Sequence, residues 1–132
     1  MEKTSVSLSV ILPVYNEEEN IENTIKQVFH ILPHISNDFE VIAVDDGSRD
    51  KTYPILLNLK AHFKGLDIIR QNRNRGYGGA LISGFKRAYK EYIFFMDSDG
   101  PFDFSDIWRL LIFKEYDIVA WIRIERKDTI MR

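Results

Sequence analysis

The stretch Tyr92-Ile93-Phe94-Phe95-Met96-Asp97-Ser98-Asp99 decides the fold, because an apolar run ends here in two carboxylates. A run this apolar is typical of a strand buried on both faces, as in parallel sheets covered by helices. Side chains at the C-terminal end of such a strand emerge at the edge where open α/β sheets bind ligands. We therefore expect Asp97 and Asp99 at a ligand-binding edge, about 7 Å apart in an extended chain at ~3.3 Å per residue.

The chemistry of this Asp-x-Asp pair has two interpretations. Two hard oxygen ligands at this spacing suit a divalent cation that also binds phosphate oxygens. Alternatively, the two aspartates cap the next helix or lie solvated in a turn, which is the commoner situation for an isolated Asp-x-Asp pair. The choice between these interpretations depends on the rest of the chain.

Length and composition indicate a single domain over residues 1–132. The chain is too short for two independent cores, and its 45% hydrophobic content argues against disorder. A formal net charge of −2 gives no attraction to nucleic acid, so we expect no such partner. The absence of cysteine excludes disulfides and thiolate metal sites. No apolar run approaches ~18 residues and no signal peptide is visible, so we expect a soluble cytoplasmic protein, at most peripheral to a membrane.

Strand and helix patterns alternate along the chain. Asn16 is a candidate N-cap of the first helix, with the glutamates at 17–19 in its first turn and Pro33 ending the pattern. The expected strands are 6–14, 39–44, 66–70, the run in 92–99 that ends in the two carboxylates, and 117–122, and the later helices are 55–63, 80–89 and 105–113. This alternation predicts an α/β fold, a Rossmann-like and mostly parallel sheet with helices on both faces.

Polar or glycine-rich clusters follow the strands at 13–17, 45–48, 72–79 and 97–100. Because the carboxyl ends of parallel strands meet at one edge, all four clusters can reach one ligand. Carboxylates in 45–48 can accept hydrogen bonds from ribose hydroxyls or a base N–H. Alternatively, this cluster is only a turn in which Ser48 caps the next helix.

The 72–79 cluster is rich in both glycine and arginine. Its glycines allow a close approach to phosphate before a helix, and Arg73 and Arg75 add positive charge, although the glycines also suit a simple turn. The cluster lacks the third glycine of the dinucleotide fingerprint, and the chain has no Walker loop. His30 and His34 are separated by Pro33 and are interpreted as ordinary residues rather than metal ligands.

Four segments of the chain together resemble the inverting family-2 glycosyltransferases of the GT-A fold. The segments are SVILPVYNEEENIENTI (9–25), VIAVDDGSRDKT (41–52), NRNRGYGGALISGFKRA (72–88) and FFMDSDGPFD (94–103). The likeness covers almost the whole chain in the right order, and it is strongest to the polyprenyl-phosphate branch, such as dolichol-phosphate mannosyltransferase.

The resemblance implies a site for a UDP- or GDP-sugar. The first-strand cluster and the aspartate pair would hold the base and ribose, while Asp97 and Asp99 would hold Mg²⁺ or Mn²⁺ on the diphosphate. Such a cation stabilises the charge that develops on the departing diphosphate. The nucleotide-sugar-binding residues implied are Pro13, Tyr15, Glu17, Asp45, Asp46, Arg75, Gly76, Gly78, Asp97 and Ser98.

The C-terminal segment WIRIERKDTIMR resembles an arginine-rich segment of the polyprenyl-phosphate branch. By this resemblance Arg123 and Arg126 would hold a lipid-phosphate acceptor or the diphosphate. The alternative is a solvated tail in which Glu125 and Asp128 offset the positive charge.

Two departures from the family pattern affect the expected activity. Pro101 stands where relatives often carry a glutamine that helps to hold the metal. The chain ends at Arg132, before the part that supplies the acceptor site and, in many members, the catalytic base, so no catalytic residue is assigned. We therefore expect donor binding, with a non-catalytic nucleotide-sugar-binding or interaction module as the alternative to a transferase.

The short chain also bears on self-association and on a competing fold. An apolar sheet edge left exposed by the early end predicts homo-oligomerisation. A phosphoacceptor domain of the flavodoxin type would need its acidic pair after the first strand and a lysine after the fifth. The residues at both places differ from that pattern, which argues against this class.

Overall fold

The structure, a computed structural model, describes residues 4–98, 109 and 111. The chain divides into two compact units, Met1–Phe102 and Asp103–Arg132, and the fold below is that of the first. The predicted helix 105–113, the strand 117–122 and the roles of Asp99, Arg123 and Arg126 lie outside the described residues, apart from helical Arg109 and Leu111. The single-domain organisation stays a prediction.

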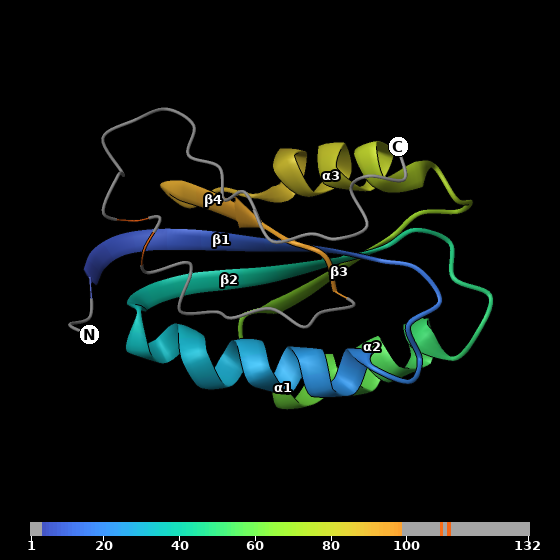
Figure 1. The fold of residues 1–132 in the computed structure, drawn as a ribbon, viewed down its shortest axis with the longest axis horizontal. Coiled ribbons are helices and arrows are strands. Elements are labelled where there is room, and N and C mark those ends of the chain that lie inside the picture. The colour runs from blue at the N-terminus through green and yellow to red at the C-terminus, as the bar shows by residue number, and fades with distance from the viewer. Residues whose placement is uncertain (1–3, 99–108, 110, 112–132) are drawn as a thin grey trace, which may run out of the picture. The chain divides into compact units, whose positions relative to one another are not determined.

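Strands and helices alternate along the first unit. They are β1 (Thr4–Val14), α1 (Ile21–Ile31), a 3-10 turn (Leu32–His34), β2 (Ser36–Asp45), α2 (Thr52–His62), β3 (Leu66–Arg70), α3 (Gly76–Arg87) and β4 (Tyr92–Phe95). The strands pair in parallel in the order β3-β2-β1-β4, with α1 and α2 on one face and α3 on the other (Figure 1). The predicted α/β class with helices on both faces is confirmed. Within the part of the chain described, no helix is long and apolar enough to cross a membrane.

The core lies around the two central strands, β1 and β2. Residues 10–12 and 41–44 are fully buried, as expected for strands covered by helices on both faces. Helix α1 buries Ile21, Ile25 and Val28 at helical spacing. Helix α3 approaches β1 closely at Gly84, where a Cβ would lie 2.5 Å from the side chain of Ile11. These contacts give the sheet a rigid centre.

Two predicted helix starts are wrong by four residues, and the predicted start of α2 at residue 55 is wrong by three, since α2 begins at Thr52. Helix α1 begins at Ile21, with Asn20 at the N-cap position, and Asn16 instead has a positive φ of 50°. Helix α3 begins at Gly76 rather than residue 80, so Gly78 lies in its first turn. In both places contacts with other loops, described below, override the local sequence pattern.

Strand β4 is half exposed, so the predicted burial on both faces is wrong. Ile93 and Phe95 are 44% and 47% exposed. Among the described strands β4 lies outermost and pairs only with β1, while the Phe95 ring packs against Phe85 of α3 at 5.6 Å. One face of β4 therefore carries apolar side chains that reach solvent.

The strand order places a crevice at one edge of the sheet. The chain moves from β1 to β2 to β3 in one direction, and α3 then carries it back to β4 on the other side of β1. Ligands of open α/β sheets bind outside the carboxyl ends of the strands at such a reversal. The loops after β1, β2 and β3 all leave from this edge, on the right of Figure 1.

Candidate functional site

The loops that follow β1 and β2 are joined by hydrogen bonds. The Asn16 N–H donates to Ser48 Oγ (2.8 Å), and Asn16 Oδ1 accepts from the Arg49 N–H (2.9 Å). The Glu17 N–H donates to Thr52 Oγ1 (2.8 Å). Asn16 has a positive φ rather than an N-cap conformation because its backbone N–H and its side-chain oxygen both bind the loop after β2.

Asp50 stabilises the start of α2 and the first loop together. Its Oδ1 accepts from the Thr52 N–H (2.9 Å), and its Oδ2 accepts from the Glu18 N–H (3.3 Å). Burial raises the pKa of Asp50, but the hydrogen bonds from Thr52 and Glu18 outweigh it and lower the pKa below its usual value. The alternative in which Ser48 caps α2 is wrong, because Lys51 lies at the N-cap position.

Asp46 joins the loop after β2 to the start of α3. Its Oδ1 accepts from the Arg75 N–H (2.8 Å), and its Oδ2 accepts from the Gly76 N–H (2.9 Å). The Gly76 N–H also donates to Asn74 Oδ1 (2.8 Å). Both amides lie at a helix N-terminus, where no earlier turn supplies an acceptor, so these side-chain acceptors explain why α3 extends back into the glycine run. Gly47 permits the contact, since its φ is +79° and a Cβ there would lie 2.7 Å from the Arg73 carbonyl carbon.

Asp45 has no exposed surface, and its two oxygens have different surroundings. Its Oδ1 accepts from the Ser48 N–H (3.1 Å), and its Oδ2 lies 3.8 Å from Arg70 Nε, too far for a hydrogen bond. The Arg70 guanidinium lies over the Tyr53 ring at 4.1 Å. Among the residues described, none donates a hydrogen bond to this buried Oδ2.

The segment after β4 carries the first carboxylate of the Asp-x-Asp motif. The Met96 N–H donates to the Ile11 carbonyl (3.2 Å), so pairing with β1 continues one residue beyond the strand. Asp97 is then exposed, and Ser98 is buried with its carbonyl accepting from Thr24 Oγ1 of α1 (3.0 Å). Asp97 therefore lies between two anchored residues at the reversal point of the sheet.

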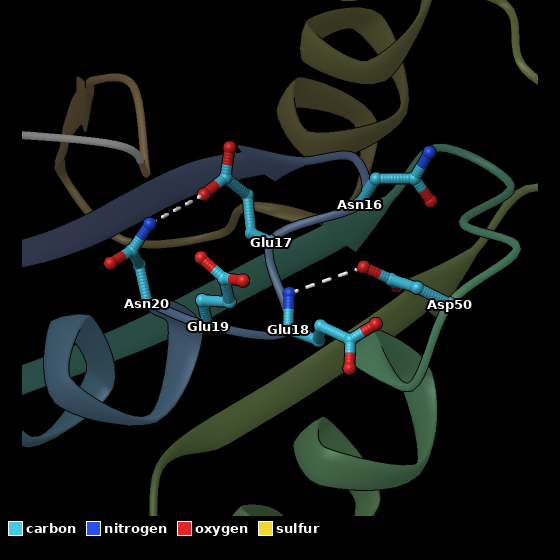
Figure 2. Close-up of a pocket in the computed structure, with 6 residues that line it drawn as sticks. All are labelled: Asn16, Glu17, Glu18, Glu19, Asn20 and Asp50. Atoms are coloured by element: carbon cyan, nitrogen blue, oxygen red, sulfur yellow. Dashed lines mark hydrogen bonds between the residues drawn. The ribbon is translucent and has the colours of Figure 1, made fainter.

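A shallow pocket of about 310 Å³ lies beside these loops (Figure 2). It is lined by residues 16–20 and Asp50, and its side chains include the carboxylates of Glu17, Glu18 and Glu19. The Glu17 carboxylate accepts from Asn20 Nδ2 at 3.4 Å. Four carboxylates give the pocket a negative charge, so an anionic diphosphate would be repelled from it without a cation.

The structure brings some of the predicted site residues together. Asp46, Arg75 and Gly76 are joined by hydrogen bonds, and the loop bearing Glu17 is tied to the loop after β2. Of the remaining predicted residues, Pro13, Asp45 and Ser98 are buried, whereas Tyr15, Gly78 and Asp97 are exposed. Their roles toward a ligand stay predictions.

Sequence reasoning missed hydroxyl groups that build the site. Thr52 accepts from the first loop and Thr24 donates to the segment after β4. Thr24 could have been found, since it lies on the buried side of α1 between Ile21 and Ile25, where an apolar residue is expected.

The chain is similar in sequence to a known protein family and to characterised members of it. Residues 9–129 match the family described as Glycosyl transferase family 2. The chain is 32% identical over 129 residues to undecaprenyl-phosphate 4-deoxy-4-formamido-L-arabinose transferase of Pectobacterium carotovorum. The aligned residues make up 96% of this chain and 39% of the relative. This chain therefore spans about two fifths of the length of that relative.

Two solved structures share the fold. S. aureus TarS in complex with UDP-GlcNAc has a TM-score of 0.66 and 26% identity, over 83% of this chain and 31% of that one. Glucosyl-3-phosphoglycerate synthase from Mycobacterium tuberculosis, in complex with Mn²⁺, UDP and glucosyl-3-phosphoglycerate, has a TM-score of 0.58 and 26% identity, over 71% of this chain and 34% of that one. The GT-A resemblance is confirmed, and this chain belongs to glycosyl transferase family 2.

Proposed function

We propose that this chain binds a UDP- or GDP-sugar together with a divalent cation, as the donor-binding part of a glycosyltransferase. The observation that carries the proposal is the meeting of the loops after β1, β2 and β3 through Asn16 and Asp46, at the sheet edge that also presents Asp97. Relatives support it, since the TarS structure holds UDP-GlcNAc and the M. tuberculosis synthase holds UDP and Mn²⁺.

The nucleotide would contact the loops after β1 and β2. Asp46 holds the start of α3 with both oxygens, but each carboxylate oxygen has a second lone pair. The same side chain can therefore hold the loop and accept a hydrogen bond from a base or ribose. Tyr15 is 41% exposed beside this loop and offers a ring to the nucleotide.

The diphosphate would lie toward the N-terminus of α3. The positive end of this helix and the exposed Arg75 favour an anion. Gly78 has no side chain in the first turn, and no atom lies within 4 Å of the position of a Cβ there. A phosphate can thus approach the backbone closely.

The cation would be held in part by Asp97. Residues 4–98, 109 and 111 contain no group of three acidic or histidine side chains that could hold a metal by themselves. Mg²⁺ and Mn²⁺ prefer about six oxygen ligands, which a diphosphate, water and carboxylates of the motif can provide together. This donor set fits a cation that binds with the nucleotide and stabilises the charge on the leaving diphosphate.

The match covers 39% of the first relative, so the complete transfer reaction is proposed for a full-length protein of this kind. One relative is named as an undecaprenyl-phosphate transferase, so we propose a polyprenyl phosphate as the acceptor. Arg123 and Arg126 remain the predicted acceptor contacts, and self-association through the exposed apolar face also stays a prediction. Attack on the anomeric carbon opposite the leaving diphosphate would invert its configuration.

Calorimetry with UDP-glucose, UDP-GlcNAc and GDP-mannose tests the proposal. With Mn²⁺ present, we expect the wild-type chain to bind at least one of them, and Asp97→Asn to weaken this binding about tenfold or more. Asp38→Asn, an exposed aspartate near the other end of β2, is the control and should leave binding unchanged. Absence of binding for all three, or equal weakening by both variants, would contradict the proposal.

A further inference from the structure

Two hydrogen bonds fix the backbone on either side of Asp97. On one side the Met96 N–H donates to the Ile11 carbonyl of β1. On the other side the Ser98 carbonyl accepts from Thr24 Oγ1 at 3.0 Å, a contact between residues 74 positions apart. Asp97 itself is exposed, so the described contacts hold its backbone while its carboxylate faces solvent.

Thr24 is well placed to act as a fixed anchor. It is 6% exposed and lies on the side of α1 where Ile21 and Ile25 are fully buried against the rest of the unit. Ser98 is 4% exposed, so the hydrogen bond is shielded from water. A shielded hydrogen bond between neutral groups holds its geometry better than one that competes with solvent.

Helix formation alone does not explain a threonine at this position. A β-branched residue with a hydroxyl is a modest helix former, and in helices its hydroxyl often bonds to the carbonyl four residues earlier. Here the Asn20 carbonyl accepts the backbone N–H of Thr24, and the hydroxyl donates to Ser98 instead. The side chain therefore connects α1 to the Asp-x-Asp motif.

We infer that Thr24 is a positioning residue for the metal-binding turn, one that holds the Ser98 carbonyl so that Asp97 is presented to the cation. This inference rests on the proposed function, because it takes Asp97 as a metal ligand. Without the anchor, the turn must lose conformational freedom when the cation and diphosphate bind, which weakens metal-dependent binding. Metal-free contacts with the base and ribose loops do not depend on Thr24.

The test compares affinities for UDP and GDP measured with saturating Mn²⁺ and with EDTA. The ratio of the two affinities is the gain that the metal provides. We expect Thr24→Val, which keeps the shape but removes the hydroxyl, to reduce this gain roughly three- to tenfold, the equivalent of one neutral hydrogen bond. Thr24→Ser keeps the donor and should restore the gain to within about twofold, and affinity in EDTA should not change.

Several outcomes would overturn the inference. An unchanged metal gain in Thr24→Val would do so, as would equal losses with Mn²⁺ and with EDTA, which indicate a purely structural role. Thr24→Ala, a better helix former, provides the same test if the valine variant fails to fold. A wild-type chain with no metal gain would instead contradict the proposed function, so the two failures are distinguishable.

Discussion

The loops after β1, β2 and β3 form the nucleotide side of the proposed site, and the 96–98 segment forms its metal side. The two sides are held in different ways. On the nucleotide side, Asn16, Asp46 and Thr52 join three loops through side chain to backbone hydrogen bonds. On the metal side, the described contacts of the 96–98 segment with the sheet and α1 are the Met96 N–H and the Ser98 carbonyl. We infer that the nucleotide side is held by a network of contacts among its loops, whereas the metal side depends on these two anchors and is completed by its ligands.

This difference has a direct consequence for mutagenesis. Substitutions in the joined loops should reduce the free energy of unfolding as well as ligand binding, because those side chains make the hydrogen bonds that connect one loop to another. Substitution of the exposed Asp97 should affect ligand binding alone. The following variants test that division.

The largest effect on stability is expected for Gly47→Ala. Its positive φ disfavours a side chain, and the new Cβ would clash with the backbone of Arg73 and Asn74 at 2.7 and 2.8 Å. We expect a loss of about 2–4 kcal/mol in the free energy of unfolding, measured by urea denaturation. Gly78→Ala is the control, since nothing lies within 4 Å of its Cβ position, and it should be neutral or slightly stabilising. A loss well below this range at Gly47 would show that the loops after β2 and β3 can move apart without a loss of stability.

Asp46→Asn and Asp97→Asn form the sharpest pair. Asp46 accepts two backbone N–H groups at the start of α3, and an amide replaces one acceptor oxygen with a donor. We expect Asp46→Asn to cost about 1–3 kcal/mol of stability, and exposed Asp97→Asn to stay within about 0.5 kcal/mol of wild type. Thermal unfolding of both variants checks this. Equal losses of stability in the two variants would contradict the difference proposed between the nucleotide side and the metal side.

Thr52→Val should have a smaller effect. The variant removes both the acceptor for the Glu17 N–H and the donor to Asp50 Oδ1, but it keeps the shape of a fully buried side chain. We expect a loss of about 1 kcal/mol in the free energy of unfolding and faster hydrogen exchange at the Glu17 amide. Thr52→Ser retains the hydroxyl and serves as the control. If the Glu17 amide exchanges equally in all three proteins, this bond does not hold the first loop.

The smallest effect concerns pH and Asp50. Hydrogen bonds lower its pKa in the folded chain below the usual 3.8, so its charged form stabilises the fold. This contribution is present above the unfolded pKa and is lost as pH falls through the folded pKa. We expect the stability difference between wild type and Asp50→Asn to shrink in acid below about pH 4. A difference that is constant from pH 6 to pH 3 would contradict the role of the charge.

The sequence was sufficient for the elements whose structure depends on local patterns. The apolar runs predicted the β1–β4 strands, and the bounds of β3 agree at both ends. The clustering of polar residues at strand ends predicted the functional edge, because parallel pairing forces those ends together. Family membership followed from the same motifs.

The errors arose where distant side chains replace local interactions. The sequence predicted Asn16 as an N-cap, but its side-chain oxygen and its backbone N–H bind residues more than thirty positions away. The Gly76 N–H at the start of α3 donates to the distant Asp46 carboxylate as well as to nearby Asn74 Oδ1, and no helix pattern near residue 76 reveals the contact with Asp46. Strand β4 looked doubly buried because its apolar residues, including Ile93 and Phe95, do not indicate which neighbours cover them.

Paramagnetic broadening of backbone amide NMR signals by Mn²⁺, recorded with UDP or GDP present, tests the central claim most directly. We predict the strongest broadening at the amides of Asp97 and Ser98, followed by those of Arg75 and Gly76. The Gly65 amide, before β3 at the opposite edge of the sheet, should stay sharp. Broadening centred on Gly65, or confined to the acidic pocket at residues 16–20, would contradict the account.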